Sequence, residues 1–382
     1  MNSCNTNQLR RGAWLNHAIR LIASACLLAT TVYPASAHAW SLRYIGQQIL
    51  PHNFDYADTT VGGLSGIEFD PEREHFYVVS DDRSERNPAR FYTMKLDLAR
   101  FNLDTEPGHA GIRITGVTTL QSPQRQPYTR GSADPEAIRR SSMPNRLIWS
   151  SEGNADKDIL PSIDEIELNG THVRSLPVPA RFLPQGKRGT RDNRAFESLA
   201  VMHETQRLYV GTENALIQDG PAADHLLGSP CRIIAFDLKT GAPGVPQAEF
   251  VYVTDPVPVP PSLPFMFHTN GLVELLAADN NQLLALERAY TLGVGNSIRL
   301  YLIDLSQASD VSMIESLDGA EYRPVAKSLV LNLDSLRIPL DNIEGMSWGP
   351  RLSNGNRSLV FVSDNNFSMR QITQFLAFEV IP

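Results

Sequence analysis

The chain has 382 residues, 42% of them hydrophobic and 20% charged, and its formal net charge at pH 7 is −8. This acidic balance disfavours nucleic acid and anionic membranes as partners. A small anionic substrate is compatible with it, because bound cations can invert the field within a local site.

Residues 1–39 have the pattern of an export signal. A positive start precedes an apolar stretch over residues 21–33, and small residues match a cleavage site after Ala37 or Ala39. The positive charges are Arg10, Arg11 and Arg20. A permanent anchor is the weaker alternative, because the apolar stretch is shorter than the roughly 20 residues that a membrane-spanning helix needs. We expect export by the general or the twin-arginine route to the periplasm or the medium, without stable membrane insertion.

Cleavage would change both the charge and the cysteine content of the chain. The signal carries three arginines and no acid, so the mature chain would have a net charge of −11. Of the three cysteines only Cys231 would remain, which excludes an intramolecular disulfide. We therefore expect residues 40–382 to form one monomeric domain held together by an apolar core, which roughly 340 residues can supply.

A pair of short runs typical of β-strands occurs five times along the rest of the chain. In the last copy the two runs flank Asn354 and Gly355, a turn typical of a hairpin. The pairs lie at 64–69 and 76–81, 135–138 and 147–152, 196–201 and 208–213, 270–272 and 283–287, and 343–348 and 359–362.

Two further strands accompany the hairpins. A third strand ends in an apolar-acid-apolar triplet at 96–98, 166–168, 236–238, 303–305 and 378–380. A fourth strand follows four of these triplets, at 111–120, 173–178, 248–253 and 327–333. The connections over 122–134, 220–230 and the proline-rich 255–264 are predicted to be irregular.

The fifth copy lacks its fourth strand, whereas residues 41–50 form a strand candidate without a hairpin of its own. Copies of about four strands at a period of roughly 60 to 75 residues predict an all-β propeller. We count five four-stranded blades, with a sixth as the alternative. Residues 41–50 are expected to complete the last blade and to close the ring.

Polar residues begin and end the five hairpins. Because the strands are antiparallel, both ends of each hairpin should meet at one mouth of the central channel. The opening residues are Ser65, Glu136, Glu197, Asn270 and Glu344. The closing residues are Asp81, Glu152, Glu213, Glu287 and Asp364.

Eight of these ten residues are carboxylates, which would repel one another in a desolvated funnel unless protons, bases or cations compensate them. Calcium, which accepts six to eight oxygen ligands, suits the set, whereas zinc and iron fit poorly without histidine or cysteine. The alternative is structural: the acids bond backbone N–H groups of neighbouring blades and hold the ring together.

Arginines beside the acids are candidates for binding a phosphate or for neutralising a neighbouring carboxylate. They are Arg83, Arg191, Arg194 and Arg288. The chain has neither a Gly-x-Ser-x-Gly nucleophile motif nor a phosphate-binding glycine loop before a helix. Its histidines are scattered, and His268, just before Asn270, is the candidate for a general base.

Several segments together resemble the "esterase-like activity of phytase" family, also called phytase-like domain proteins. They are DNRAFESLAV (192–201), LER (286–288), DNIEGMSWGP (341–350), VFVSDNNFS (360–368) and QFLAFEV (374–380). The likeness extends from about Gly62 to the C-terminus, and it implies an exported propeller. The family name implies hydrolysis of phosphate or carboxylic esters, and more distant propeller phytases bind phosphate through a calcium cluster. By position, the acidic motif residues of the family correspond to Glu197, Glu287, Glu344 and Asp364.

We therefore predict a calcium-dependent hydrolase of phosphate esters, with Arg194, Arg288 and Glu197 as catalytic residues. The expected metal ligands are Asp81, Glu136, Glu152, Glu197, Glu213, Glu287, Glu344 and Asp364. A non-catalytic binding propeller with structural calcium is one alternative, with Phe265, Phe267 and Tyr290 as its contact surface. A lactonase or carboxylesterase is the other.

Overall fold

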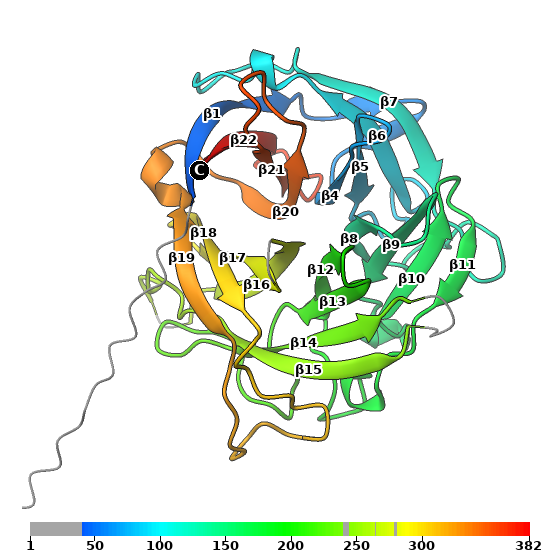
Figure 1. Ribbon diagram of the computed structural model, residues 1–382, viewed down its shortest axis with the longest axis vertical. Coiled ribbons are helices and arrows are strands. Elements are labelled where there is room, and N and C mark those ends of the chain that lie inside the picture. The colour runs from blue at the N-terminus through cyan, green and yellow to red at the C-terminus, as the bar shows by residue number, and fades with distance from the viewer. Residues whose placement is uncertain (1–39, 240–243, 264, 279–280) are drawn as a thin grey trace, which may run out of the picture. The chain divides into compact units, whose positions relative to one another are not determined.

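The computed structural model describes residues 40–239, 244–263, 265–278 and 281–382. The predicted export signal lies outside these residues. In the described part, no helix is both long enough and apolar enough to cross a membrane. Twenty strands form five four-stranded antiparallel sheets, which are arranged as blades around a common axis (Figure 1). The predicted five-bladed propeller is confirmed.

In blades 1 to 4 the strands follow chain order from the axis outward (Figure 1). Blade 1 contains β4 (Leu64–Asp70), β5 (His75–Ser80), β6 (Arg90–Leu96) and β7 (Ile112–Thr119). Blade 2 contains β8 (Pro135–Arg140), β9 (Arg146–Ser151), β10 (Ser162–Glu167) and β11 (His172–Ser175). Blade 3 contains β12 (Phe196–Met202), β13 (Arg207–Thr212), β14 (Pro230–Asp237) and β15 (Pro246–Val253). Blade 4 contains β16 (His268–Ala277), β17 (Gln282–Thr291), β18 (Gly295–Asp304) and β19 (Ala326–Asn332).

Blade 5 combines the two ends of the described chain. From the axis outward it contains β20 (Asn342–Gly349), β21 (Ser358–Asp364), β22 (Thr373–Ile381) and β1 (Ser41–Leu50). β1 pairs with β22 from Ser41 opposite Ile381 to Leu50 opposite Thr373. The predicted closure of the ring is therefore confirmed. Because β1 pairs with it, β22 is not left as an open edge of the sheet.

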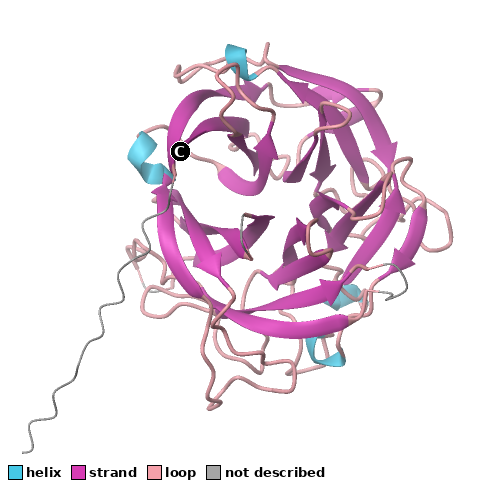
Figure 2. Ribbon diagram, viewed as in Figure 1, coloured by secondary structure: helices cyan, strands magenta, loops and turns pink. Residues whose placement is uncertain are grey.

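The smaller elements lie outside the blades. The sequence patterns did not predict the two-stranded hairpin of β2 (Phe54–Tyr56) and β3 (Thr59–Val61). Short 3-10 helices occupy the periphery of the ring (Figure 2). They are η1 (Leu98–Arg100), η2 (Ala155–Lys157), η3 (Ala180–Phe182) and η4 (Leu333–Leu336).

The core consists of five apolar layers, one between each pair of neighbouring blades. Between blades 5 and 1, for example, Val362 and Phe375 pack with Leu64 and Val78. Corresponding clusters fill the other four seams. Sheets covered on both faces require apolar residues on both sides of each strand, which explains why the inner strands appear as continuous apolar runs.

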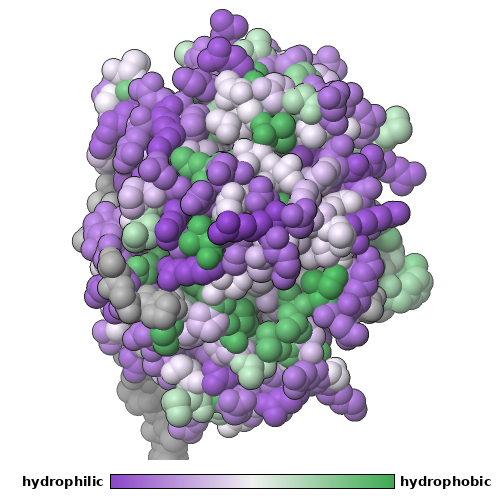
Figure 3. Space-filling model, turned by 90° about the vertical axis from the view of Figure 1, so that its right-hand side faces the viewer, coloured by the Kyte–Doolittle hydropathy of each residue, from purple (hydrophilic) through white to green (hydrophobic). Residues whose placement is uncertain are grey.

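The outside of the ring is largely polar. Figure 3 shows one side of it, where hydrophilic residues cover most of the surface and hydrophobic side chains form smaller groups between them. Cys231, by contrast, is buried in the seam between blades 3 and 4 as a free thiol.

A single side chain, Arg139 from β8, fills the axis. The residue is 1% exposed, and its guanidinium donates hydrogen bonds to one backbone carbonyl from every blade. The accepting carbonyls are those of Ile67 at 2.7 Å, Ile138 at 2.9 Å, Leu199 at 2.8 Å, Leu275 at 2.8 Å and Met346 at 3.1 Å. Glu274 lies 2.6 Å away and balances the charge. Arg139 therefore separates the two ends of the channel.

Candidate functional site

A β-bulge occurs in every inner hairpin, two residues before the carbonyl that binds Arg139. A bulge leaves one residue out of the hydrogen-bonded register and re-aims its side chain. The residues left out are Ser65 in blade 1, Glu136 with Ala137 in blade 2, Glu197 in blade 3, Val273 in blade 4 and Glu344 in blade 5. The predicted opening residues of four blades thus share one structural position.

The closing residues form a second ring of five positions. In blade 1, Leu64 before the bulge pairs with Ser80, so that Asp81 follows the strand pair. The same register places Glu152, Glu213 and Asp364 in blades 2, 3 and 5. In blade 4, Leu272 pairs with Glu287, and the closing position is therefore held by Arg288.

The predicted assignment of blade 4 is consequently wrong by register. Asn270 pairs with Ala289, three residues before the bulge at Val273. Glu287 accepts hydrogen bonds from Tyr252 Oη at 2.6 Å, Asn270 Nδ2 at 2.7 Å and Lys327 Nζ at 2.8 Å. These contacts hold Glu287 in a separate polar cluster, so the structure does not bring it together with the other predicted metal ligands.

A cavity of about 570 Å³ occupies the end of the channel where the two rings lie. We call it the acidic cavity. Its lining includes six of the eight predicted metal ligands: Asp81, Glu136, Glu197, Glu213, Glu344 and Asp364. Arg194 and Arg288, the predicted catalytic arginines, line it as well. Glu152 lies behind the lining and is 5% exposed.

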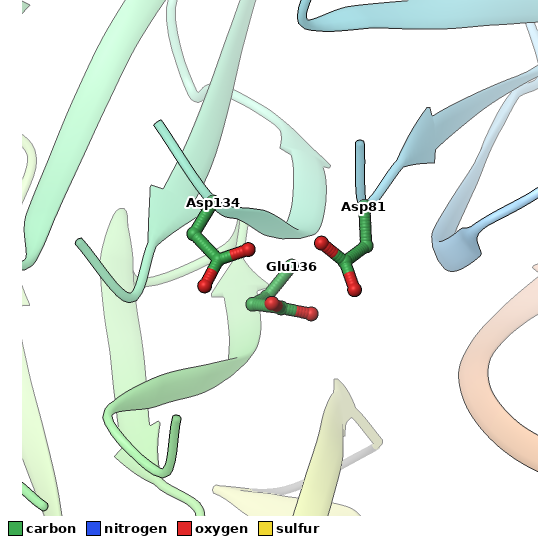
Figure 4. Close-up of side chains that lie close together, drawn as sticks. All are labelled: Asp81, Asp134 and Glu136. Atoms are coloured by element: carbon green, nitrogen blue, oxygen red, sulfur yellow. The ribbon is translucent and has the colours of Figure 1, made fainter. Parts of the chain in front are cut away.

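Two overlapping groups of carboxylates are close enough to share a cation. Asp81, Asp134 and Glu136 each place one oxygen within 4.8 Å of the others (Figure 4). Glu136, Glu152 and Glu197 form the second group under the same limit. Figure 4 shows the first three side chains pointing towards one another from blades 1 and 2. Glu136 belongs to both groups.

Asp134 was not among the predicted site residues. It is the last residue of the connection over 122–134, whose composition indicated only an irregular loop. The sequence signal that could have identified it is its position directly before the strand that carries Glu136, because this position lies at the mouth of the channel. Arg83 binds it, with Nε 2.7 Å from Oδ1 and Nη2 2.7 Å from Oδ2.

The electrostatics of the two groups favour proton or cation uptake. Burial raises the pKa of Glu136 well above its usual range, and the charges of Asp81, Glu197 and Asp134 raise it further. Burial together with the charge of Asp134 acts in the same direction on the pKa of Asp81 and of Glu152. Carboxylates with raised pKa values are destabilised as anions, and a bound cation relieves this.

The opposite side of the acidic cavity is already compensated by Arg288. Its Nη2 atom donates to Glu344 Oε1 at 2.8 Å and lies 3.7 Å from Glu213 Oε1. Burial alone would lower the pKa of Arg288, but Glu344, Glu213 and Glu197 raise it. Asn342 Nδ2 donates to the same Glu344 oxygen at 2.9 Å. Among the acids of the two groups, Asp134 is paired with Arg83, whereas Asp81, Glu136, Glu152 and Glu197 form no ion pair in the described part of the chain.

The other candidate residues differ in their placement. Arg194 lines the acidic cavity and forms no ion pair among residues 40–382 as described. Arg191 instead donates to the carbonyls of Ala215 and Gly220. His268 is not part of the lining; its Nδ1 atom lies 2.8 Å from the Met266 carbonyl. The predicted role of His268 as a general base lacks the required position.

The two carboxylate groups fit a calcium-sized cation. Ca²⁺ binds oxygen at about 2.3–2.6 Å, so ligands on opposite sides of the ion are about 5 Å apart. In each group the carboxylate oxygens lie within 4.8 Å of one another, which is close enough for them to bind one calcium ion. In addition, Glu152 Oε2 is buried without a hydrogen-bond partner among the described residues. All of these donors are carboxylate oxygens, which calcium and magnesium prefer over sulfur or nitrogen.

Comparisons with known proteins identify one family. The profile described as "Phytase-like: Esterase-like activity of phytase" matches residues 59–367. No curated protein matches the chain. Among solved structures, an oxidoreductase of Thermus thermophilus described as a glucose dehydrogenase shares 12% identity at a TM-score of 0.35, covering 89% of this chain and 99% of that chain. The α-L-arabinofuranosidase of Podospora anserina in complex with cellotriose shares 10% identity at a TM-score of 0.44, covering 90% and 97%.

Proposed function

Since this chain belongs to the phytase-like family, described by an esterase-like activity, we propose that it is an exported, calcium-dependent hydrolase of phosphate esters. The reaction would take place in the acidic cavity. The observation that supports this most is the pair of carboxylate groups that share Glu136, in which five buried or half-buried acids have Arg83 as their one ion-pair partner among the described residues. Export rests on the signal pattern of residues 1–39.

Asp81, Asp134 and Glu136, the first carboxylate group, would hold the cation, and Glu152 lies with Glu136 and Glu197 in the second group. When bound, calcium supplies charge that polarises a phosphoryl oxygen and lowers the pKa of a coordinated water. Glu213 and Glu344 belong to neither group, and Arg288 lies beside both of them. Glu287 is excluded by its separate hydrogen-bond cluster.

Glu197 is the candidate for proton transfer. It lines the acidic cavity, and burial followed by the charges of Glu152, Glu213 and Glu344 raises its pKa well above the usual range. A carboxylate with a raised pKa is a more effective base near neutral pH. In the proposed reaction a water oxygen forms a bond to phosphorus while the ester P–O bond breaks. Glu197 takes the proton from the water and returns it to the leaving alcohol.

Two arginines would bind the phosphoryl oxygens. Arg288 lines the cavity, and its Nε atom has no hydrogen-bond partner among the described residues. Arg194 lines the same cavity without an ion pair in that part of the chain. Guanidinium groups stabilise the negative charge on a phosphoryl group through directed hydrogen bonds.

The proposal is tested by phosphate release from p-nitrophenyl phosphate with purified protein. We expect a chelator to abolish the release and added calcium to restore it. Glu197→Gln should lower the rate by roughly 100-fold or more, because general acid–base catalysis contributes about that much. The matched control is Glu321→Gln, which changes an exposed glutamate outside the cavity and should leave the rate unchanged.

Melting curves in calcium and a panel of other esters separate the two alternatives. Stabilisation by calcium without hydrolysis of any ester would favour a binding propeller, with Phe265, Phe267 and Tyr290 as its contact surface. Turnover of lactones or p-nitrophenyl acetate, but of no phosphate ester, would favour a carboxylesterase that uses the same cavity. Phosphate release that is indifferent to chelator would contradict the role of calcium.

A further inference from the structure

The acidic cavity has two chemically different walls. Carboxylates from blades 1, 2, 3 and 5 form one wall. The opposite wall is formed by blade 4 and the segment leading to β20, and it contributes Phe267, Tyr290 and Leu340. A ligand that fills the cavity must therefore present an ionic side and an apolar side.

The length of the fourth hairpin produces the apolar wall. β16 and β17 have ten residues each, whereas the inner strands of the other blades have six to eight. The additional residues extend past the bulge at Val273 and carry Thr269 and Tyr290 to the cavity. Phe267 directly precedes β16, and its ring centroid lies 6.1 Å from that of Tyr290.

This wall is open to a ligand. Phe267 is 55% exposed although it lies beside another aromatic ring. Thr269 is 4% exposed, yet its Oγ1 atom has no hydrogen-bond partner among the described residues. Exposed aromatic side chains next to a few polar groups are typical of small-molecule sites, because the apolar surface is covered only when the ligand binds.

The charge of the cavity limits the charge of the ligand. Seven carboxylates and three arginines line it, for a formal charge of −4 when all are ionised. Even two bound divalent cations would do no more than neutralise this lining. Each phosphate monoester carries roughly −1.5 to −2 near pH 7. A ligand with a phosphate on every ring carbon would leave most of its charge uncompensated, and like charges in a partly buried site repel strongly.

We infer that the site takes monoesters with a single phosphate and an aromatic or otherwise apolar alcohol, and that it discriminates against polyphosphorylated rings. This inference rests on the proposed function, because it assumes that the ester is bound where the carboxylate groups lie. The phosphate lies between these groups and the arginines, and the alcohol lies against Phe267 and Tyr290. The two aromatic residues determine specificity without taking part in the reaction.

The test compares 1-naphthyl phosphate, β-glycerophosphate and inositol hexakisphosphate in calcium. We expect kcat/KM to be highest for the naphthyl ester and lowest for the hexakisphosphate. Phe267→Ala and Tyr290→Ala should each lower kcat/KM for the naphthyl ester by roughly tenfold, as expected for the loss of an apolar contact. The value for β-glycerophosphate should change by less than about twofold. Met313→Ala is the control, since this side chain is 91% exposed and outside the lining.

The outcomes separate this inference from the proposed function. Faster hydrolysis of inositol hexakisphosphate than of the naphthyl ester would overturn the inference and support the proposed function. Calorimetric binding of 1-naphthyl phosphate that is weakened by Phe267→Ala, without hydrolysis of any ester, would support the inference and contradict the proposed hydrolysis. Equal effects of both aromatic substitutions on all three esters would overturn the role assigned to this wall.

Discussion

The guanidinium of Arg139 donates hydrogen bonds to backbone carbonyls of all five blades at the axis of the ring. Inner strands that converge on an axis direct carbonyl groups to a region that no further strand can reach. Arg139 supplies the donors for five of them. Buried carbonyls without a donor are costly, because they lose their hydrogen bonds to water.

We expect Arg139→Met to lower the free energy of unfolding by about 3–5 kcal/mol, the usual effect of breaking a buried ion pair. Denaturant unfolding measures this. Burial raises the pKa of Glu274 to about 7 even with Arg139 present, so adding Glu274→Gln to Arg139→Met should recover part of the loss. Arg113→Met, at an exposed position on β7, should change stability by about 0.5 kcal/mol or less. Similar values for both single variants would contradict the role of Arg139.

Glu136 offers a second prediction at the scale of one residue. Removing its charge by Glu136→Gln relieves repulsion from Asp81 and Glu197 but removes a ligand shared by both carboxylate groups. In chelator the variant should therefore melt at a higher temperature than the unmodified protein. In calcium the order should reverse, because the variant loses the stabilisation that ligand binding provides. A variant that is less stable in both conditions would contradict a cation site at Glu136.

Among the elements, β4 of blade 1 lies close against β8 of blade 2 at the bulges of both strands. A Cβ atom at Gly66 of β4 would lie 2.8 Å from the Glu136 carbonyl oxygen and 2.9 Å from Ala137 Cα on β8. Both neighbours are backbone atoms, which cannot move without displacing the strand. The position of Glu136 thus depends on a glycine in the adjacent blade.

We predict that Gly66→Ala lowers the free energy of unfolding by about 1–3 kcal/mol, the usual range for overpacking. It should also weaken calcium binding, measured by calorimetry, because β8 must shift. Gly116→Ala, on the outer strand β7, is the matched control. A Cβ atom at Gly116 would lie 3.6 Å from Thr93 of β6, which is an ordinary van der Waals distance. Unchanged calcium affinity in Gly66→Ala would show that the strand contact does not set the site.

Most elements could be predicted from the sequence because each hairpin combines apolar runs with a turn and polar ends. The register of the fourth hairpin could not. Its strands are buried on both faces, so the apolar pattern does not mark one face, and Asn270 and Glu287 were assigned because they are the polar residues at the ends of its apolar runs. The bulge at Val273 shifts the equivalence to Arg288.

The site itself was predicted in part. Six of the eight metal ligands predicted from the sequence line one cavity, since strand ends of similar hairpins converge in a propeller. Asp134 and Arg139 were missed for physical reasons. Asp134 precedes its strand within a loop, and a charged residue inside a strand normally indicates a solvent-exposed face, whereas Arg139 is buried at the axis.

For the whole molecule, the carboxylates of the acidic cavity should determine how stability depends on pH. Burial raises the pKa values of Asp81, Glu136, Glu152, Glu197 and Asp364 above their ordinary range in the folded protein. Above about pH 4 the folded state therefore binds more protons than the unfolded state, and stability falls as pH rises.

We predict that the melting temperature of the chelated protein is higher at pH 5.5 than at pH 8. Calcium should reduce this difference, because it replaces the protons that the folded state otherwise takes up. Thermal melts at both pH values, with chelator and with calcium, measure the effect. A chelated protein that becomes more stable between pH 5.5 and pH 8 would contradict the electrostatic description of the cavity.

The shared fifth blade has a consequence for synthesis. Arg43 of β1 bonds Glu379 of β22, a residue 336 positions later in the chain. On the ribosome, β1 emerges long before its partner exists, and its main-chain donors and acceptors stay open to other nascent chains. Blades 1 to 4 can form during translation, but the ring is completed only after the last strand has left the exit tunnel. Until then, a holding chaperone that binds β1 would protect the chain from aggregation.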